Sequence, residues 1–176
     1  MKRTLSRLAT ASTAILTLGL LAPAAASAEV RNCVGGGTVG TWTCRTTGGG
    51  IIDNGVRGLI ELSGSGRHAS AQIQGGSNVT ATAPGSLGLR YYPSDLTAGA
   101  AQITVELKSR QPGCKAGRHA SARDVLTSDM DGVFQELSVP VSCAGPVSYT
   151  VTVRAATTSP QGHFTATVSL GDPQLA

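Results

Sequence analysis

Apolar and polar residues alternate along much of the chain, most clearly in the range 137–170. Three short runs there repeat with a period of two, which places apolar side chains on one face of a strand and polar ones on the other. The runs are separated by Ala144-Gly145-Pro146 and by Ser159-Pro160-Gln161-Gly162, and the second separator suits a type I turn. The pattern predicts a meander of three antiparallel strands that forms the floor of the core, with Cys143 on its inward phase. Pro140 has no N–H to donate, so it should face a sheet edge.

Shorter alternating runs precede this meander, at residues 60–62, 69–73, 79–83, 87–91 and 103–107. Gly, Pro, Ser and Asn separate them at roughly the 8–12-residue spacing of all-β domains. A half-buried sheet needs a second layer over its apolar face. We therefore predict an all-β fold, an antiparallel β-sandwich that is immunoglobulin-like or related, with about 7–10 short strands. Residues 121–130 alone suggest a helix, because Ser121 and Asp124 fit a capping box, so at most one short helix is expected there.

Residues 1–28 have the three parts of a secretory signal peptide. A basic n-region at residues 2–7 precedes an apolar run at 14–21, and Ala26-Ser27-Ala28 fits a small-x-small cleavage site. The apolar run is far below the roughly 18 residues that span a bilayer, so we expect a cleaved signal and no transmembrane anchor. The mature chain, residues 29–176, is then a single secreted domain, and its composition is typical of a bacterial export product.

Removal of this segment changes the charge of the protein. Three of the 14 Lys and Arg residues lie within it and none of the 10 acidic residues does, so the mature chain carries a net charge of +1. A protein so close to neutral offers little support for a basic patch that binds nucleic acid or anionic lipid. No nucleic-acid partner is expected.

Four cysteines follow the proposed cleavage site, an even number for an oxidising compartment. Three pairings are possible, and Cys33–Cys44 with Cys114–Cys143 is preferred because short loops are the easiest to close. Each of the two disulfides would contribute about 3 kcal/mol. The spacings are wide and no C-x-x-C occurs, so we expect neither a metal nor a cofactor. Trp42 shares a strand face with Cys44, an arrangement typical of a sandwich core.

Two further patterns in the sequence concern ligand binding. Asp124, Asp129 and Asp131 resemble part of an acidic calcium loop, but they lack its evenly spaced oxygens and its final glutamate. We interpret them as turn or capping acids, with a stabilising Ca²⁺ as the open alternative.

The hexapeptide Gly-Arg-His-Ala-Ser-Ala occurs at 66–71 and again at 117–122 without matching flanks. We interpret the repetition as chance, and the alternative is a pair of elements that hold an anionic ligand.

Arg90-Tyr91-Tyr92-Pro93 is the best candidate for a binding surface. Tyr91 has the phase of Leu87 and Leu89 and should point inward, which leaves Tyr92 outward beside Arg90. Exposed aromatic rings stack on sugars or anchor protein interfaces. The low aromatic content of 3% argues against a platform of several rings.

Catalytic signatures are absent from the sequence. His68, His119 and His163 accompany many serines, but no G-x-S-x-G elbow or similar motif supports a hydrolase. We predict a monomeric, non-catalytic protein that acts by binding or structural contact with a cell-wall polymer, another extracellular protein or a small ligand. The alternatives are an extracellular hydrolase with a dispersed site and a protease inhibitor that presents the loop between Cys33 and Cys44. The glycines of that loop argue against the inhibitor, since such loops gain affinity from rigidity.

Overall fold

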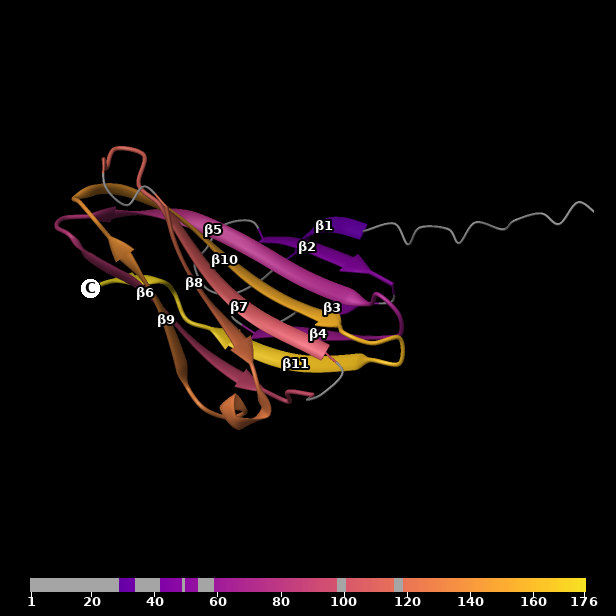
Figure 1. Cartoon of the computed structure of the whole chain (residues 1–176). Coiled ribbons are helices and arrows are strands. Elements are labelled where there is room, and N and C mark those ends of the chain that lie inside the picture. The colour runs from indigo at the N-terminus through magenta and orange to yellow at the C-terminus, as the bar shows by residue number, and fades with distance from the viewer. Residues whose placement is uncertain (1–28, 34–41, 49, 54–58, 98–100, 116–118) are drawn as a thin grey trace, which may run out of the picture.

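The computed structural model describes residues 29–33, 42–48, 50–53, 59–97, 101–115 and 119–176 (Figure 1). It contains twelve strands and one short 3-10 helix within this part of the chain. The strands are β1 (Glu29–Cys33), β2 (Trp42–Thr47), β3 (Ile51–Asp53), β4 (Leu59–Ser65), β5 (Ser70–Ala81), β6 (Gly85–Ser94), β7 (Ala101–Arg110), β8 (His119–Leu126), β9 (Gln135–Val141), β10 (Gly145–Thr157), β11 (His163–Leu170) and β12 (Gln174–Leu175). The 3-10 helix η1 covers Ser128–Met130.

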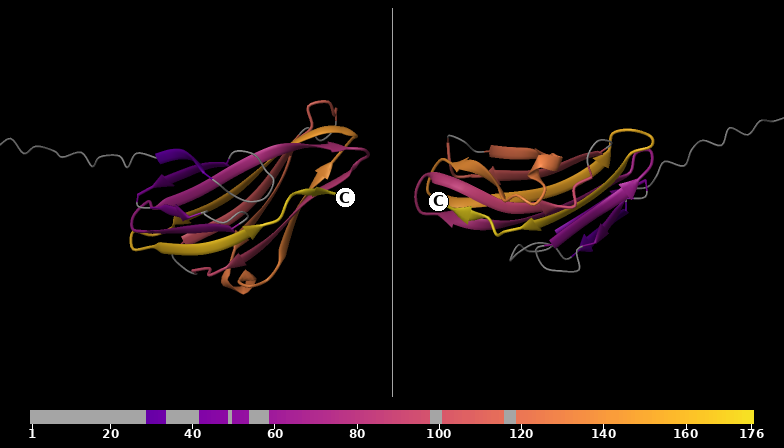
Figure 2. Two further views of the ribbon diagram at one scale, coloured as in Figure 1. Left: turned by 180° about the vertical axis from the view of Figure 1, so that it is seen from behind. Right: turned by 90° about the horizontal axis from the view of Figure 1, so that it is seen from below.

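The strands form two antiparallel sheets that pack face to face (Figures 1 and 2). Sheet A has the order β1-β2-β5-β10-β7-β8. Sheet B has the order β12-β6-β11-β4-β3, and β9 pairs with β6 beside this path. Consecutive strands often belong to different sheets, so the chain crosses repeatedly between the layers. The predicted antiparallel β-sandwich is confirmed.

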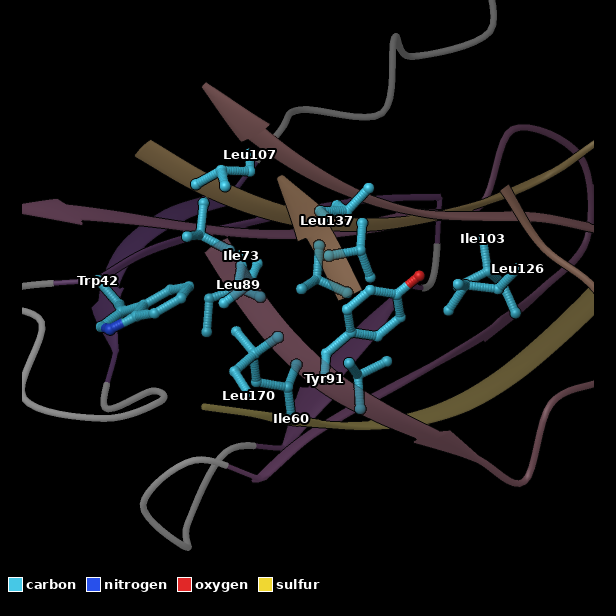
Figure 3. Close-up of a cluster of buried hydrophobic side chains, with 14 of the residues drawn as sticks. Trp42, Ile60, Ile73, Leu89, Tyr91, Ile103, Leu107, Leu126, Leu137 and Leu170 are labelled. Carbon is cyan, nitrogen blue, oxygen red and sulfur yellow. The ribbon is translucent and has the colours of Figure 1, made fainter. Parts of the chain in front are cut away.

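The core lies between the sheets and consists of the apolar phase of each long strand. Trp42 stands at one end of the layer and Tyr91 lies near its middle (Figure 3). The Trp42 ring packs directly on Gly75, where a Cβ atom would come 2.5 Å from Cδ2 of the indole. Phe164 lies in the same way over Gly64, with 2.7 Å from a Cβ to Cζ. Both aromatic rings therefore occupy space that any side chain at these glycines would fill.

The three strands expected between residues 137 and 170 exist, but the meander is wrong. β9 pairs with β6, β10 with β5 and β7, and β11 with β4 and β6, so none of the three pairs with another. The alternation of apolar and polar residues shows which face of a strand is buried. It does not show which strand lies beside it, because the inward faces of all strands meet the same core. The turn at 159–162 is as expected, with the Gly162 N–H donating to the Ser159 oxygen at 3.0 Å. Pro140 is exposed on β9, which lies at the side of sheet B.

The expected helix at 121–130 is mostly a strand. β8 continues to Leu126, and only the single turn η1 follows. Ala120, Ala122 and Asp124 are less exposed than their neighbours, so the segment alternates like a strand. The Asp124 carboxylate bonds to a side chain of the opposite sheet and is not a helix cap.

The structure describes only part of the N-terminal region to which the sequence predictions refer. β1 and β2 pair as an antiparallel hairpin, while the glycine-rich segment between Cys33 and Cys44 lies outside the described residues. The proposed signal segment, residues 1–28, also lies outside them. Among the residues that are described, no helix is long and apolar enough to cross a membrane.

Candidate functional site

The candidate site is the outward face of β6 together with the start of β9. On β6 the buried Tyr91 alternates with Arg90, which is exposed, and with Tyr92, which is half-buried. Phe134 and Glu136 lie beside them and were not expected at a site. These four residues, Arg90, Tyr92, Phe134 and Glu136, are called the aromatic edge below.

Strand register and aromatic packing bring the aromatic edge together. Arg90 stands opposite Glu136 in the β6–β9 ladder, and Nε of the guanidinium lies 3.2 Å from Oε2 of the carboxylate. Phe134 precedes Glu136 by two residues and lies against Tyr92, with ring centroids 4.9 Å apart and ring planes at 54°. This tilted contact leaves Phe134 77% exposed. A large apolar ring therefore faces solvent, held from behind by a second ring.

The segment before β9 places Phe134 on Tyr92. The Gly132 N–H donates to the Pro93 oxygen at 2.9 Å, and the Leu96 N–H donates to Oδ1 of Asp131 at 3.3 Å. Gly132 has a φ of +73°, a conformation that a residue with a Cβ atom adopts with strain. These bonds pin the turn to the end of β6, so the Phe134 ring is presented from an anchored segment.

Hollows flank the aromatic edge on two sides. One, of about 390 Å³, is lined by Arg90, Phe134, Gln135 and Glu136. A second, of about 270 Å³, shares Arg90 and Glu136 and adds Gly88, Asp172 and the last residues of the chain. The Gly171 N–H donates to the Arg90 oxygen at 2.9 Å, which fixes the segment after β11 beside β6.

The charges of the aromatic edge are open to solvent. The Arg90 and Glu136 side chains are 81% and 53% exposed. An exposed ion pair of this kind contributes at most about 1 kcal/mol to folding, because water solvates each charge well. Its donors and acceptors can therefore turn to a ligand at little cost in stability.

Tyr91 joins the two sheets beneath this surface. Its hydroxyl donates to Oδ2 of Asp124 on β8 of sheet A. Burial, together with the hydrogen bond and the negative charge of Asp124, raises the pKa of Tyr91 above its usual range. The phenol therefore stays protonated in the fold.

The three aspartates that resemble part of a calcium loop make different contacts. Asp124 holds Tyr91, and Asp131 accepts the Leu96 N–H. The hydrogen bond from the Thr127 side chain lowers the pKa of Asp129, which stays exposed on η1. Within the described ranges, no three His, Cys, Asp or Glu side chains gather where they could hold a metal ion.

The cysteine prediction needs a correction. Cys44 is disulfide-bonded, while the side chain of Cys33, its expected partner, lies outside the described ones. Cys114 and Cys143 are free, so the second disulfide is wrong. Their thiols are neighbours, and the hydrogen bond to Cys114, together with burial, raises the pKa of the Cys143 thiol. Cys143 also lies in the turn after β9, outside the inward strand phase expected for it.

A buried amide holds the two thiol-bearing turns together. Nε2 of Gln111 donates to the Cys143 oxygen and Oε1 accepts the Ser142 N–H, both at 2.7 Å. The backbone carbonyl oxygen of Gln111 accepts the Cys114 N–H at 3.2 Å. The expected proximity of the two cysteines thus exists, and hydrogen bonds rather than a sulfur–sulfur bond maintain it.

The histidines are dispersed. His68, His119 and His163 are all exposed; His119 begins β8 in sheet A and His163 begins β11 in sheet B. His68 lies in the turn before β5 with a φ of +64°. The first hexapeptide copy leads into β5 and the second into β8, and part of the second lies outside the described residues. The hydrolase alternative stays an untested prediction.

A third hollow lies on the outer face of sheet A. Its volume is about 320 Å³, and it is lined only by polar and charged side chains. They come from β5, β10, β7 and β8, namely Gln72, Gln74, Thr104, Glu106, Lys108, Arg123, Thr150, Thr152 and Arg154. The sequence had not indicated a binding site at these positions.

No protein-family model and no curated protein matches this sequence. Solved structures with a similar fold include TmCBM61 in complex with β-1,4-galactotriose, at 12% identity and a TM-score of 0.40, covering 72% of this chain and 87% of that one. A structure of carbohydrate-binding modules from the β-sandwich superfamily has 13% identity and a TM-score of 0.36, over 84% of this chain and 56% of that one. The enzymatically active domain of bacteriophage CBA120 tailspike protein 4 has 11% identity and a TM-score of 0.39, over 85% of this chain and 19% of that one. These likenesses concern the fold alone.

Proposed function

We propose that this chain is a non-catalytic, carbohydrate-binding protein that acts outside the cell and holds a sugar on the aromatic edge. One observation carries the proposal: Phe134 is 77% exposed, leans on Tyr92, and lies beside the exposed Arg90–Glu136 pair. Placement outside the cell is supported only by the signal-like pattern of residues 1–28.

A sugar ring matches this arrangement chemically. Its C–H face is apolar and weakly positive, while the face of an aromatic ring is negative, so the two stack. Its hydroxyls form a rim around that face. The Arg90 guanidinium donates and the Glu136 carboxylate accepts, so both kinds of hydrogen bond are available next to the stacking ring.

A protein partner fits less well, because the apolar surface is small. A stable protein interface covers about 800 Å² on each side and has an apolar centre. Among the described residues, Val133 and Phe134 are the only large hydrophobic side chains exposed in this region by more than a third, apart from Leu175 at the neighbouring hollow. One ring with a polar surround suits a single sugar unit better than a protein surface.

The test is binding of the mature chain to a panel of purified polysaccharides, including galactan, xylan, glucan and peptidoglycan, measured by pull-down and calorimetry. For the glycan that binds, Phe134→Ala should weaken affinity about 5–30-fold, the effect of losing about 1–2 kcal/mol of stacking. Val125→Ala is the matched control, since it removes a side chain that is 44% exposed on the opposite sheet.

Two results would contradict the proposal. Equal affinity of wild type and the Phe134 variant would remove the aromatic edge as the site. Release of reducing ends from the bound glycan would show catalysis and favour the hydrolase alternative, with Glu136 and Asp172, which line one hollow, as the carboxylates to substitute next.

A further inference from the structure

The outer face of sheet A presents polar and charged side chains that are arranged in rows. Strand register aligns outward side chains in rows across the sheet, since opposite residues lie about 5 Å apart. One row runs Thr43, Gln74, Thr152, Glu106, Arg123, and the next runs Arg45, Gln72, Arg154, Thr104. We call the residues of these two rows, with Thr150 and Lys108, the sheet A tray; its centre is the hollow of about 320 Å³.

The outer face of sheet A is basic, although residues 29–176 carry a net charge of only +1. Five basic residues occupy outward positions of the described strands β2, β5, β7, β8 and β10: Arg45, Lys108, Arg110, Arg123 and Arg154. Glu106 is the sole acid at such positions, which gives this face a charge of +4. Around the outer side of sheet B, by contrast, the acids Glu61, Asp95, Glu136 and Asp172 face solvent, and Arg90 is the one Lys or Arg on the described parts of its strands.

The basic groups of the tray are available to a ligand. Lys108 pairs with Glu106, with 2.9 Å between Nζ and Oε2. Arg45, Arg123 and Arg154 make no ion pair to any described residue. Arg45 and Arg123 each lie two strands from Arg154, a spacing of about 9.5 Å along the row direction. Arg45 and Arg154 thus lie in one row and Arg123 in the adjacent row, so the three residues together span the five strands from β2 to β8.

We propose that the sheet A tray binds an acidic polysaccharide, a polymer of sugar rings that carry carboxylates. A guanidinium matches a carboxylate in a planar, two-bonded geometry, and spaced guanidiniums match a repeating anion. The amides of Gln72 and Gln74 and the hydroxyls of Thr150 and Thr152 can bond the sugar hydroxyls between the charges.

Nucleic acid is the other polyanion to weigh, and the tray lacks what it needs. Proteins that hold single strands stack bases on aromatic rings, and those that read duplexes insert side chains into grooves. No Phe, Tyr or Trp occupies an outward position on the described parts of β2, β5, β7, β8 and β10. Apart from the exposed Val125 opposite Thr104, the two rows present hydroxyl, amide and charged groups, which suit a hydroxyl-rich polymer.

The test compares polygalacturonate with three other polymers: neutral galactan, dextran sulfate and single-stranded DNA. Calorimetry at low and moderate salt gives each affinity. Polygalacturonate should bind more tightly than the others, and its binding should weaken with salt because the tray is exposed. Arg154→Gln and Arg123→Gln should each weaken it about tenfold. Glu106→Gln should tighten it, since it removes the one anion of the face.

Arg67→Gln is the matched control, because Arg67 is exposed in the turn before β5 and lies off the tray. Phe134→Ala separates this site from the aromatic edge and should leave polygalacturonate binding unchanged. The proposal is overturned if dextran sulfate or DNA binds as tightly as polygalacturonate, if galactan binds equally, or if the Arg67 variant loses as much affinity as the Arg154 variant. Thermal unfolding of every variant excludes loss of fold as the cause.

Discussion

Gln111 offers the sharpest test of how the sandwich is held together. It is 2% exposed, lies just after β7, and reaches the turn between β9 and β10 through both ends of its amide. The substitution Gln111→Ala removes one donor and one acceptor and leaves the Cys143 oxygen and the Ser142 N–H without those partners. Each buried group left unpaired costs about 1–3 kcal/mol. We expect a loss of about 2–5 kcal/mol in the free energy of unfolding, since the site can relax in part.

Urea denaturation followed by circular dichroism measures this loss, and Gln161→Ala in the exposed turn before β11 is the control. Gln111→Glu is a second test, because it leaves the size of the side chain almost unchanged and alters only its charge and hydrogen bonds. Its ionised carboxylate accepts from Ser142 but repels the Cys143 oxygen, whereas its protonated form can donate to that oxygen. The folded pKa of the new carboxyl should thus be raised, and the deficit relative to wild type should grow as the pH rises through it. A Gln111→Ala variant within about 0.5 kcal/mol of wild type, the range of ordinary surface changes, would refute this account.

Three further predictions follow from the core and the thiols. Gly75→Ala should destabilise the fold by about 1–3 kcal/mol in the same denaturation assay, because its Cβ meets the Trp42 ring at 2.5 Å; Gly113→Ala, with open space around it, should not, and equal losses would contradict the packing argument. Burial and the bond to Asp124 raise the pKa of Tyr91, so stability is present below the ordinary tyrosine range and falls as the pH rises above about 10. Tyr91→Phe should flatten that fall in thermal melts, and an unchanged slope would argue against it. Cys114 and Cys143 should both be alkylated in denatured, unreduced protein, and Cys143 only slowly in native protein because its pKa is raised; mass spectrometry showing no free thiol would contradict the structure.

The sequence allowed the fold class to be predicted because alternation reports burial directly. Tyr91 inward, Trp42 with Cys44 on one buried face, and the turn ending at Gly162 all follow from local pattern and turn chemistry. Strand neighbours do not follow, because β9 looks the same from its own residues whether it pairs with β6 or with β10. Pairing depends on all strands together, and no short window of sequence contains it.

The candidate site was half visible in the sequence. Arg90 and Tyr92 stood out as polar and aromatic residues beside a buried tyrosine. Phe134 was missed because the alternating run was started at Leu137; extended back by three residues, the same run places Phe134 and Glu136 on its outward phase. An aromatic residue at an outward, otherwise polar position of a predicted strand is a signal of a binding site that can be found in the sequence. The basic tray had no such signal, since its four cations come from four strands that only the fold brings together.

The separation of charge between the two outer faces has a mechanical consequence. The faces look in opposite directions from one core, with sheets packed about 10 Å apart. A glycan at the proposed aromatic-edge site and an acidic polymer at the proposed tray site would therefore run on opposite sides of the same domain. One molecule cannot lay both faces on a single flat fibre, so a second contact adds no avidity there. On these two proposals, one molecule would cross-link two different polymers, and a mixture of the two should stiffen into a gel as protein is added.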